Sequence, residues 1–146
     1  MFDLTLREVM GRNPLITVNP EATVMDVSRA MASANTGAVV VIDAGHAVGI
    51  FTERDAVYRV VAKELNPATT AVRQVMTNTP LMLPADATYG LAMAAMHEHG
   101  FRHIPVTEQG TVIGIVTARN ALDPELEEFV SEERRREHWG KLARDL

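Results

Sequence analysis

The stretch Gly49-Ile50-Phe51-Thr52-Glu53-Arg54-Asp55 has the pattern of a β-strand that runs into the N-terminus of a helix. A β-rich run precedes it, and a segment with helical apolar periodicity follows it. The free N–H groups and the positive dipole end of such a junction suit a phosphate or a sugar edge. The same residues also fit a plain strand–helix corner, with Thr52 as N-cap and Glu53 in the first turn.

The stretch recurs as Gly114-Ile115-Val116-Thr117-Ala118-Arg119-Asn120, at an offset of 65 residues (114 minus 49). Earlier residues recur as well, since Val9-Met10 and Pro14 return as Val75-Met76 and Pro80. Each half therefore predicts a helical turn, a strand, a helix, a strand, a hairpin, a strand and a helix. A repeat that combines identities, spacing and turn chemistry indicates two copies of one supersecondary unit.

Local signals place the elements of the first copy. A capping box, Thr5-Leu6-Arg7-Glu8, opens a short helix, and Thr23 can cap a longer one. The expected ranges are a strand at 15–18, a helix at 22–34, strands at 38–42 and 47–51, and a helix from 53 to about 65. Hairpins are expected at Asp43-Ala44-Gly45 and Glu108-Gln109-Gly110.

The predicted division of the chain follows the repeat. Residues 1–66 form the first repeat, residues 67–122 the second, and residues 123–146 a charged, helical C-terminal extension. In the extension acidic residues precede basic ones, an order that the helix dipole favours. It is expected either to be a solvated helix or to make a dimer or partner contact through Phe129 and Trp139.

Composition excludes several classes of protein. The 146 residues contain no cysteine, which excludes disulfides, thiolate zinc sites and a cysteine nucleophile and fits a reducing compartment. A formal net charge of −5 argues against nucleic-acid and anionic-membrane partners. Without an apolar run long enough for a signal peptide or a membrane span, the expectation is a soluble, cytoplasmic protein.

The tandem pattern closely resembles a CBS-domain pair, or Bateman module, over about residues 5–122. The matching segments are Val9-Met10, Pro14, 38–43 and 49–55 in the first copy, and Val75-Met76, Pro80, 103–106 and 114–120 in the second. The resemblance implies an α+β, sandwich-like fold of two β-α-β-β-α repeats related by a pseudo-twofold axis, with two related clefts. It also implies a non-enzymatic regulatory role, a homodimer, and an adenosine-containing ligand such as AMP, ADP, ATP or S-adenosylmethionine.

The resemblance implies a first cleft built from both repeats. Its residues would be Gly49, Thr52, Asp55, Pro80, Leu81, Met82, Arg102, His103 and Ile104. In this cleft the Asp55 carboxylate would accept hydrogen bonds from a ribose diol, and Arg102 would supply a permanent positive charge. Leu81, Met82 and Ile104 would form an apolar slot for adenine.

The second implied cleft would combine Gly114, Thr117 and Asn120 with Pro14, Leu15, Ile16, Thr36, Ala38 and Val39. Asn120 replaces the aspartate of the family pattern, so this position keeps its hydrogen bonding and loses its charge. Ala38-Val39 also offers no cation where the first cleft has Arg102-His103. We therefore expect the second cleft to be weaker, empty or selective for an uncharged nucleoside.

Alternative functions remain open at this point. His97, His99 and His103 could suggest a metal-assisted enzyme, but a spacing of two on a helix points side chains apart, so no metal site and no required cofactor are expected. The chain could also be a purely structural dimerisation module with empty clefts. A further, unidentified protein partner is compatible both with a ligand-binding regulatory module and with a dimerisation module.

Overall fold

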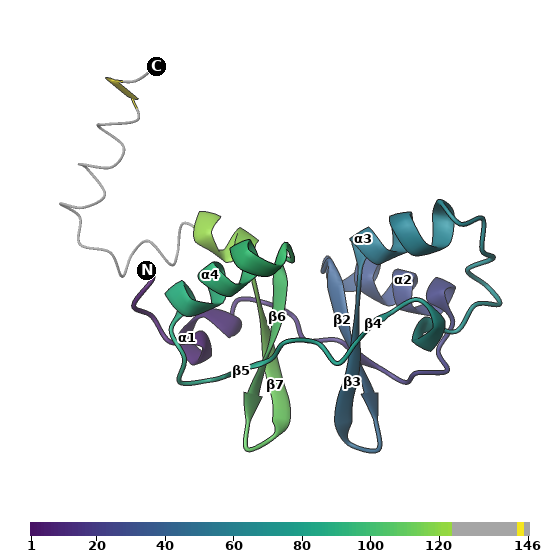
Figure 1. Ribbon diagram of the computed structural model, residues 1–146, viewed down its shortest axis with the longest axis horizontal. Helices are drawn as coiled ribbons and strands as arrows, with labels where there is room; N and C mark the ends of the chain where they lie inside the picture. Colours follow the sequence, from purple (N-terminus) through teal and green to yellow (C-terminus); the bar gives the residue numbers. More distant parts are fainter. Residues whose placement is uncertain (124–142, 145–146) are drawn as a thin grey trace.

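The computed structural model of the protein describes residues 1–123, 143 and 144. These residues form two similar halves side by side, each with its own twisted sheet and covering helices (Figure 1). The α+β fold with two related repeats is as the sequence predicts. The predicted C-terminal helix, with Phe129 and Trp139, lies outside the described residues, apart from 143 and 144.

The first sheet has the strand order β1-β2-β3-β4. Its strands are β1 (Thr17–Val18), β2 (Ala38–Asp43), β3 (His46–Thr52) and β4 (Thr77–Asn78). Strand β1 is parallel to β2, and the remaining neighbours are antiparallel. The helical segments of this half are α2 (Val24–Ala34), α3 (Glu53–Asp55), the π-helix η1 (Ala56–Val61) and η2 (Val72–Gln74).

The second sheet has the strand order β5-β6-β7. Its strands are β5 (Leu83–Pro84), β6 (His103–Glu108) and β7 (Thr111–Thr117), with β5 parallel to β6 and the hairpin partners antiparallel. Its helical segments are α1 (Leu6–Met10), α4 (Tyr89–His99) and the 3₁₀ helix η3 (Ala118–Leu122). Both predicted hairpins are confirmed, as β2–β3 and β6–β7.

The helix caps follow the local sequence signals. Thr5 and Glu8 form the predicted capping box, Thr23 caps α2, and Thr52 caps α3. The predicted helix at 53–65 is shorter in the structure, because Ala62 N donates to Val57 O in π geometry and the left-handed Glu64 follows. The predicted strand at 15–18 narrows to Thr17–Val18. No helix in the described part of the chain has the length and apolar character of a membrane span.

The opening segment of each repeat packs into the opposite half. Helix α1 contributes the fully buried Leu6 and Val9 to the core of the second sheet, together with Tyr89 and Ile104. Figure 1 shows α1 beside β5–β7, far from the first sheet that follows it in sequence. Conversely, the η2 segment and its flank contribute buried side chains to the core of the first sheet, namely Val72 and Val75. The predicted division at 66 and 67 follows the repeat in the sequence, whereas the two cores exchange their opening segments.

This exchange explains why a glycine and a methionine recur in both repeats. A methyl group added at Gly49 would overlap the side chain of Met76, and one added at Gly114 would overlap that of Met10. We call the opening segment that packs into the opposite half the crossing segment. The glycine near the end of each repeat therefore leaves room for the methionine of the crossing segment. Between the sheets, Ala38, Ile50 and Ile115 form a small buried cluster that joins the halves.

Candidate ligand cleft

A cleft of about 760 Å³ is lined by residues from both halves. The first half contributes Ser28, Met31 and Ala32 of α2, then Asn35, Thr36, Gly37, Glu53 and Ala56. The second half contributes Arg102, His103, Thr117, Ala118, Arg119 and Leu122, and the segment after α1 adds Asn13 and Pro14. The volume is within the range of small-molecule sites in proteins.

Equivalent positions in the two halves carry side chains of different charge in this cleft. Glu53 N donates to Gly37 O at 2.9 Å, and Ala118 N donates to Arg102 O at 3.0 Å, so the two corners are built alike. The first corner presents the Glu53 carboxylate beside a glycine. The second presents the Arg102 guanidinium beside an alanine, with Arg119 one residue further on. The positive charge of the cleft is therefore concentrated on the second half.

His103, at the start of β6, lies between these charges. Burial lowers the pKa of its imidazole from the ordinary value, Arg102 and Arg119 lower it further, and Glu53 opposes them. A methyl group at Gly37 would lie 3.0 Å from Glu53 Oε1 and 3.3 Å from His103 Nε2. Gly37, having no side chain, thus allows both the Glu53 carboxylate and the His103 imidazole to lie close to its backbone.

Asn120 is buried and tied to the crossing segment. Its Oδ1 accepts hydrogen bonds from Thr117 N at 2.8 Å and Asn13 Nδ2 at 2.9 Å, and its Nδ2 donates to Asn13 Oδ1 at 3.0 Å. Asn13 Nδ2 also donates to Ile115 O at 2.8 Å. By its sequence pattern alone Asn13 would only end the first short helix, because its partners lie more than a hundred residues away.

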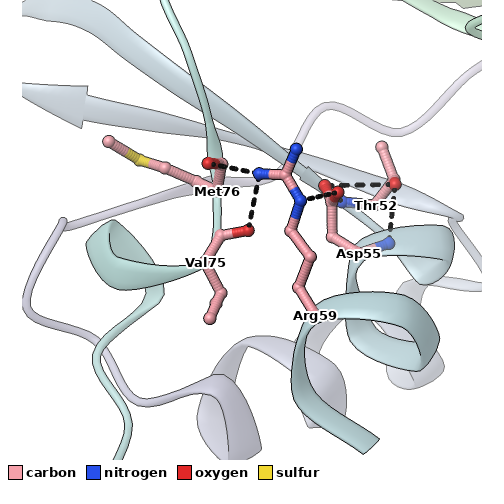
Figure 2. Close-up of polar contacts among 5 residues, drawn as sticks. All are labelled: Thr52, Asp55, Arg59, Val75 and Met76. Carbon is pink, nitrogen blue, oxygen red and sulfur yellow. Dashed lines mark hydrogen bonds and ion pairs between the residues drawn. The ribbon is translucent and has the colours of Figure 1, made fainter. Parts of the chain in front are cut away.

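The carboxylate of Asp55 is likewise held by hydrogen bonds and an ion pair within the chain, as Figure 2 shows. Its Oδ2 accepts hydrogen bonds from Thr52 N at 3.0 Å and Thr52 Oγ1 at 3.2 Å. Its Oδ1 lies 3.5 Å from Arg59 Nε, and the same guanidinium donates to Met76 O at 2.9 Å and Val75 O at 3.3 Å. Asp55 therefore caps its own helix and, through Arg59, holds the crossing segment of the second repeat.

The structure regroups the predicted site residues. Arg102 and His103, predicted for the first cleft, line the same cleft as Pro14, Thr36 and Thr117, predicted for the second. The cleft that Thr117 lines thus contains two arginines and a histidine. The sequence had instead predicted no cation in the cleft of Thr117. The reason is that β6 begins beside Gly37 and Glu53, where the two halves meet.

The other predicted residues are placed elsewhere. Gly49 lies against Met76, and Gly114 against Met10. The side chains of Leu81 and Met82 are exposed, and Pro80 is half-buried. Several others are not among the residues that line this cleft, namely Leu15, Ile16, Ala38, Val39, Thr52, Asp55, Ile104 and Asn120. Within the described ranges, no group of His, Cys, Asp and Glu side chains is placed to hold a metal ion.

The family follows from the fold and from a match along the chain. The CBS domain model matches residues 6–62 and again residues 72–124. The chain therefore belongs to the CBS-domain family, and it carries two copies of the domain. The resemblance on which the sequence analysis relies is confirmed.

Relatives occur in plants and archaea. The CBS domain-containing protein CBSCBSPB2 of Arabidopsis thaliana is 36% identical over 108 residues, covering 73% of this chain and 20% of that protein. This chain thus spans about a fifth of the length of that relative. A protein of Methanopyrus kandleri is 31% identical over 127 residues, covering 86% of this chain and 64% of its own length.

Solved structures share the arrangement. A conserved protein from Pyrococcus horikoshii has a TM-score of 0.77 at 30% identity, covering 86% of this chain and 94% of that chain. Two neighbours with TM-scores of 0.72 carry adenosine compounds. One is a CBS domain protein from Pyrobaculum aerophilum complexed with AMP, at 22% identity, covering 80% of this chain and 89% of that chain. The other is a CBS domain pair with 5′-methylthioadenosine and S-adenosyl-L-methionine, at 20% identity, covering 82% and 93%.

Proposed function

We propose that this chain is a regulatory module that binds an adenosine-containing ligand in the cleft between its two halves. The supporting observation is the cleft itself, which both halves line and which brings two arginines beside a half-buried histidine. The neighbours that hold AMP or S-adenosylmethionine lend support at the level of the fold. The module has no reaction of its own in this proposal, and it requires no further cofactor.

The chemistry of the cleft suits such a ligand. Arg102 and Arg119 can each present a forked guanidinium to a phosphate or carboxylate group. The Thr117 hydroxyl can donate to a sugar or phosphate oxygen. The apolar atoms of Met31, Ala32 and Ala56 offer a surface on which a purine ring can lie.

A ligand in this position would couple the two halves. It would contact the first half at Glu53 and the second at Arg102 and Arg119, and it would favour the relative packing in which both contacts are made. The exposed surface would then change for a homodimer or another protein partner. The apolar face of η1 offers one such surface, because Val57, Tyr58 and Val61 are 52%, 57% and 71% exposed.

The experiment is thermal unfolding against AMP, ADP, ATP with and without magnesium, S-adenosylmethionine, NAD and guanine nucleotides. A ligand at a hundred times its dissociation constant stabilises the native state by about 2.7 kcal/mol, which raises Tm by several degrees. The double variant R102Q/R119Q should lose this shift. The matched control is R54Q, which removes the arginine equivalent to Arg119 in the first repeat, outside the cleft.

A purely structural dimerisation module is the second candidate. It is favoured by one observation: the polar groups at the ends of both repeats, Asp55 and Asn120, are already hydrogen-bonded within the chain. The absence of any ligand-dependent Tm shift, together with a dimer in sedimentation, would favour this candidate over the sensor.

A further inference from the structure

The N-terminal residues 1–4 cover the first turn of α4. Leu4 O accepts a hydrogen bond from Tyr89 N at 2.8 Å, and Phe2 O accepts one from Gly90 N at 2.9 Å. These two N–H groups are among those that a helix leaves without a partner at its N-terminus. The ring of Phe2 also stacks on the ring of Tyr89, with a centroid distance of 6.3 Å and an interplanar angle of 5°. We call residues 1–4 the N-terminal strap.

Tyr89 connects this strap to the candidate ligand cleft. Its side chain is fully buried, and its hydroxyl donates to Thr117 O at 2.7 Å. The backbone of Ala121 hydrogen-bonds to the same phenolic group. Burial raises the pKa of Tyr89 to about 12, so the hydroxyl keeps its proton at neutral pH. One hydroxyl thus contacts both ends of the turn that begins at Thr117.

The turn that Tyr89 contacts forms part of the cleft wall, because Thr117, Ala118 and Arg119 line the cleft. The N–H group of Thr117 is held by Asn120 Oδ1 at 2.8 Å, and its carbonyl oxygen is held by Tyr89. Tyr89 itself is not among the residues that line the cleft. The direction in which the turn presents Thr117 and Arg119 to a ligand therefore depends on a tyrosine behind the wall.

The first repeat has the same kind of helix cap but lacks this connection. Val24 occupies the position equivalent to Tyr89, at the offset of 65 residues (89 minus 24), and its N–H group donates to Thr70 O at 2.9 Å. A valine side chain has no hydroxyl, so it cannot hydrogen-bond to Thr52, the equivalent of Thr117. Of the two equivalent corners, the one in the second repeat is tied to the cap of its helix.

We propose that Tyr89 is a positioning residue of the ligand cleft, and that the N-terminal strap and the ligand stabilise each other through it. The inference rests on the proposed function, since it concerns how that ligand is held. With the strap docked, Tyr89 holds the carbonyl group of Thr117, and the cleft wall is preorganised for binding. By reciprocity, a ligand that fixes the wall favours the docked strap by the same factor.

The strap is the end of this connection that reaches the surface. Phe2 is 57% exposed although its ring lies on Tyr89. Gly90 permits the close approach of the strap, because a methyl group at this position would lie 3.1 Å from Phe2 O. G90A therefore displaces the strap and leaves the hydroxyl of Tyr89 in place. F2A loosens the strap in a different way, because it removes the ring stack.

The test uses the full chain, with AMP as the probe. Isothermal titration measures the Kd for AMP in the parent and in Y89F, G90A and F2A. Each variant should raise the Kd on the order of fivefold. In the double variant Y89F/G90A the two free-energy effects should be less than additive, since both act through one contact. Y58F is the matched control, because the exposed Tyr58 is not among the residues that line the cleft.

A purely structural tyrosine is distinguished by comparing affinity with stability. V72A removes buried apolar atoms from the core of the first sheet, so it should lower Tm and leave the Kd for AMP unchanged at a temperature at which every variant is folded. If Y89F lowers Tm but binds AMP as tightly as the parent, Tyr89 serves only the fold and the proposal is overturned. Parental affinity in both G90A and F2A would overturn the role of the strap.

Amide hydrogen exchange, followed by NMR, tests the connection without any ligand. The amide of Ala121 should exchange faster in Y89F, G90A and F2A than in the parent, and at the parental rate in Y58F. Parental exchange of Ala121 in both strap variants overturns the coupling even where AMP binds. If AMP gives no Tm shift in the parent, the proposed function fails, and the exchange of Ala121 still decides whether the strap and the turn are connected.

The reciprocal effect is measured with AMP bound. The amide of Gly90 reports on the docked strap, because it donates to Phe2 O. Saturating AMP should slow its exchange in the parent and leave it unchanged in Y89F. Equal slowing in Y89F and the parent would show that the ligand acts on the strap without Tyr89, which overturns the proposal.

Discussion

Gly114 lies directly against Met10, so closely that a methyl group on Gly114 would overlap the methionine side chain. The two residues are separated by more than a hundred positions, and they join the last strand of the second repeat to the first helix of the chain. Gly49 and Met76 form the equivalent contact in the other half. The glycine and the methionine of the repeated motifs are thus two sides of one packing contact.

The first prediction concerns this contact. G114A should lower the free energy of unfolding by about 1–3 kcal/mol, because the added methyl group overpacks a site that is closed by Met10. Chemical denaturation measures the loss. G11A is the matched control, since a methyl group at Gly11 meets nothing within 4 Å. In the double variant G114A/M10A the two losses should be less than additive, and strict additivity would contradict the contact.

The second prediction concerns Asn13. N13A should lower the free energy of unfolding by about 1–3 kcal/mol, because it leaves buried polar atoms of Asn120 and Ile115 without a partner. N13D keeps the shape of the side chain but removes the amide donor to both oxygens, and it should be destabilising as well. Urea denaturation checks both variants. A variant N13A as stable as the parent would show that water replaces the amide without loss.

The third prediction separates two roles of Asp55. D55A should reduce stability by about 1 kcal/mol, because the Thr52–Asp55 capping box is lost. R59Q should remove the ion pair with Asp55 and weaken the contact with the crossing segment while leaving the capping box in place, and it should leave ligand affinity unchanged. If Asp55 also holds a ribose diol, D55A will raise the Kd for AMP well beyond its effect on Tm. Equal affinity for AMP in D55A and the parent would remove Asp55 from the ligand site.

The fourth prediction follows from His103. Because its pKa in the folded chain is below the unfolded value of about 6.5, the unfolded state binds more protons in the window between the two values. Stability from this group is therefore fully present above the unfolded pKa and is lost as the pH falls through the window. H103N should flatten this part of the stability profile. H46N, at an exposed hairpin position, should keep the slope of the parent.

Much of the fold depends on signals between residues that are close in sequence, and this part could be predicted. The threonine caps at Thr5, Thr23 and Thr52 and both hairpins depend on residues within a few positions of each other, and the repeat at 65 residues doubles each signal. The exchange of opening segments was not predicted, because the apolar residues of α1 fit either core equally well by pattern alone. Only the packed structure distinguishes the two.

The candidate site was predicted in its residue types but not in their grouping. Arg102, His103, Thr36 and Thr117 were all named from the sequence, in two separate sets, and all four line the cleft described above. Which wall a side chain lines depends on how the two sheets meet at Ile50 and Ile115. Arg119 and Glu53 were recognised only as parts of the repeated stretch, because their neighbours across the cleft come from the other repeat.

The exchanged helix α1 and segment η2 also bear on how this chain could have arisen. A single repeat that kept its opening segment to itself would leave one core without Leu6 and Val9, or the other without Val72 and Val75. A single repeat that used the same exchange would therefore complete its core only in a pair of identical molecules, each supplying the opening segment of the other. Duplication and fusion of its gene would have turned that mutual dependence into a single chain, free to place Glu53 on one wall and Arg102 on the other.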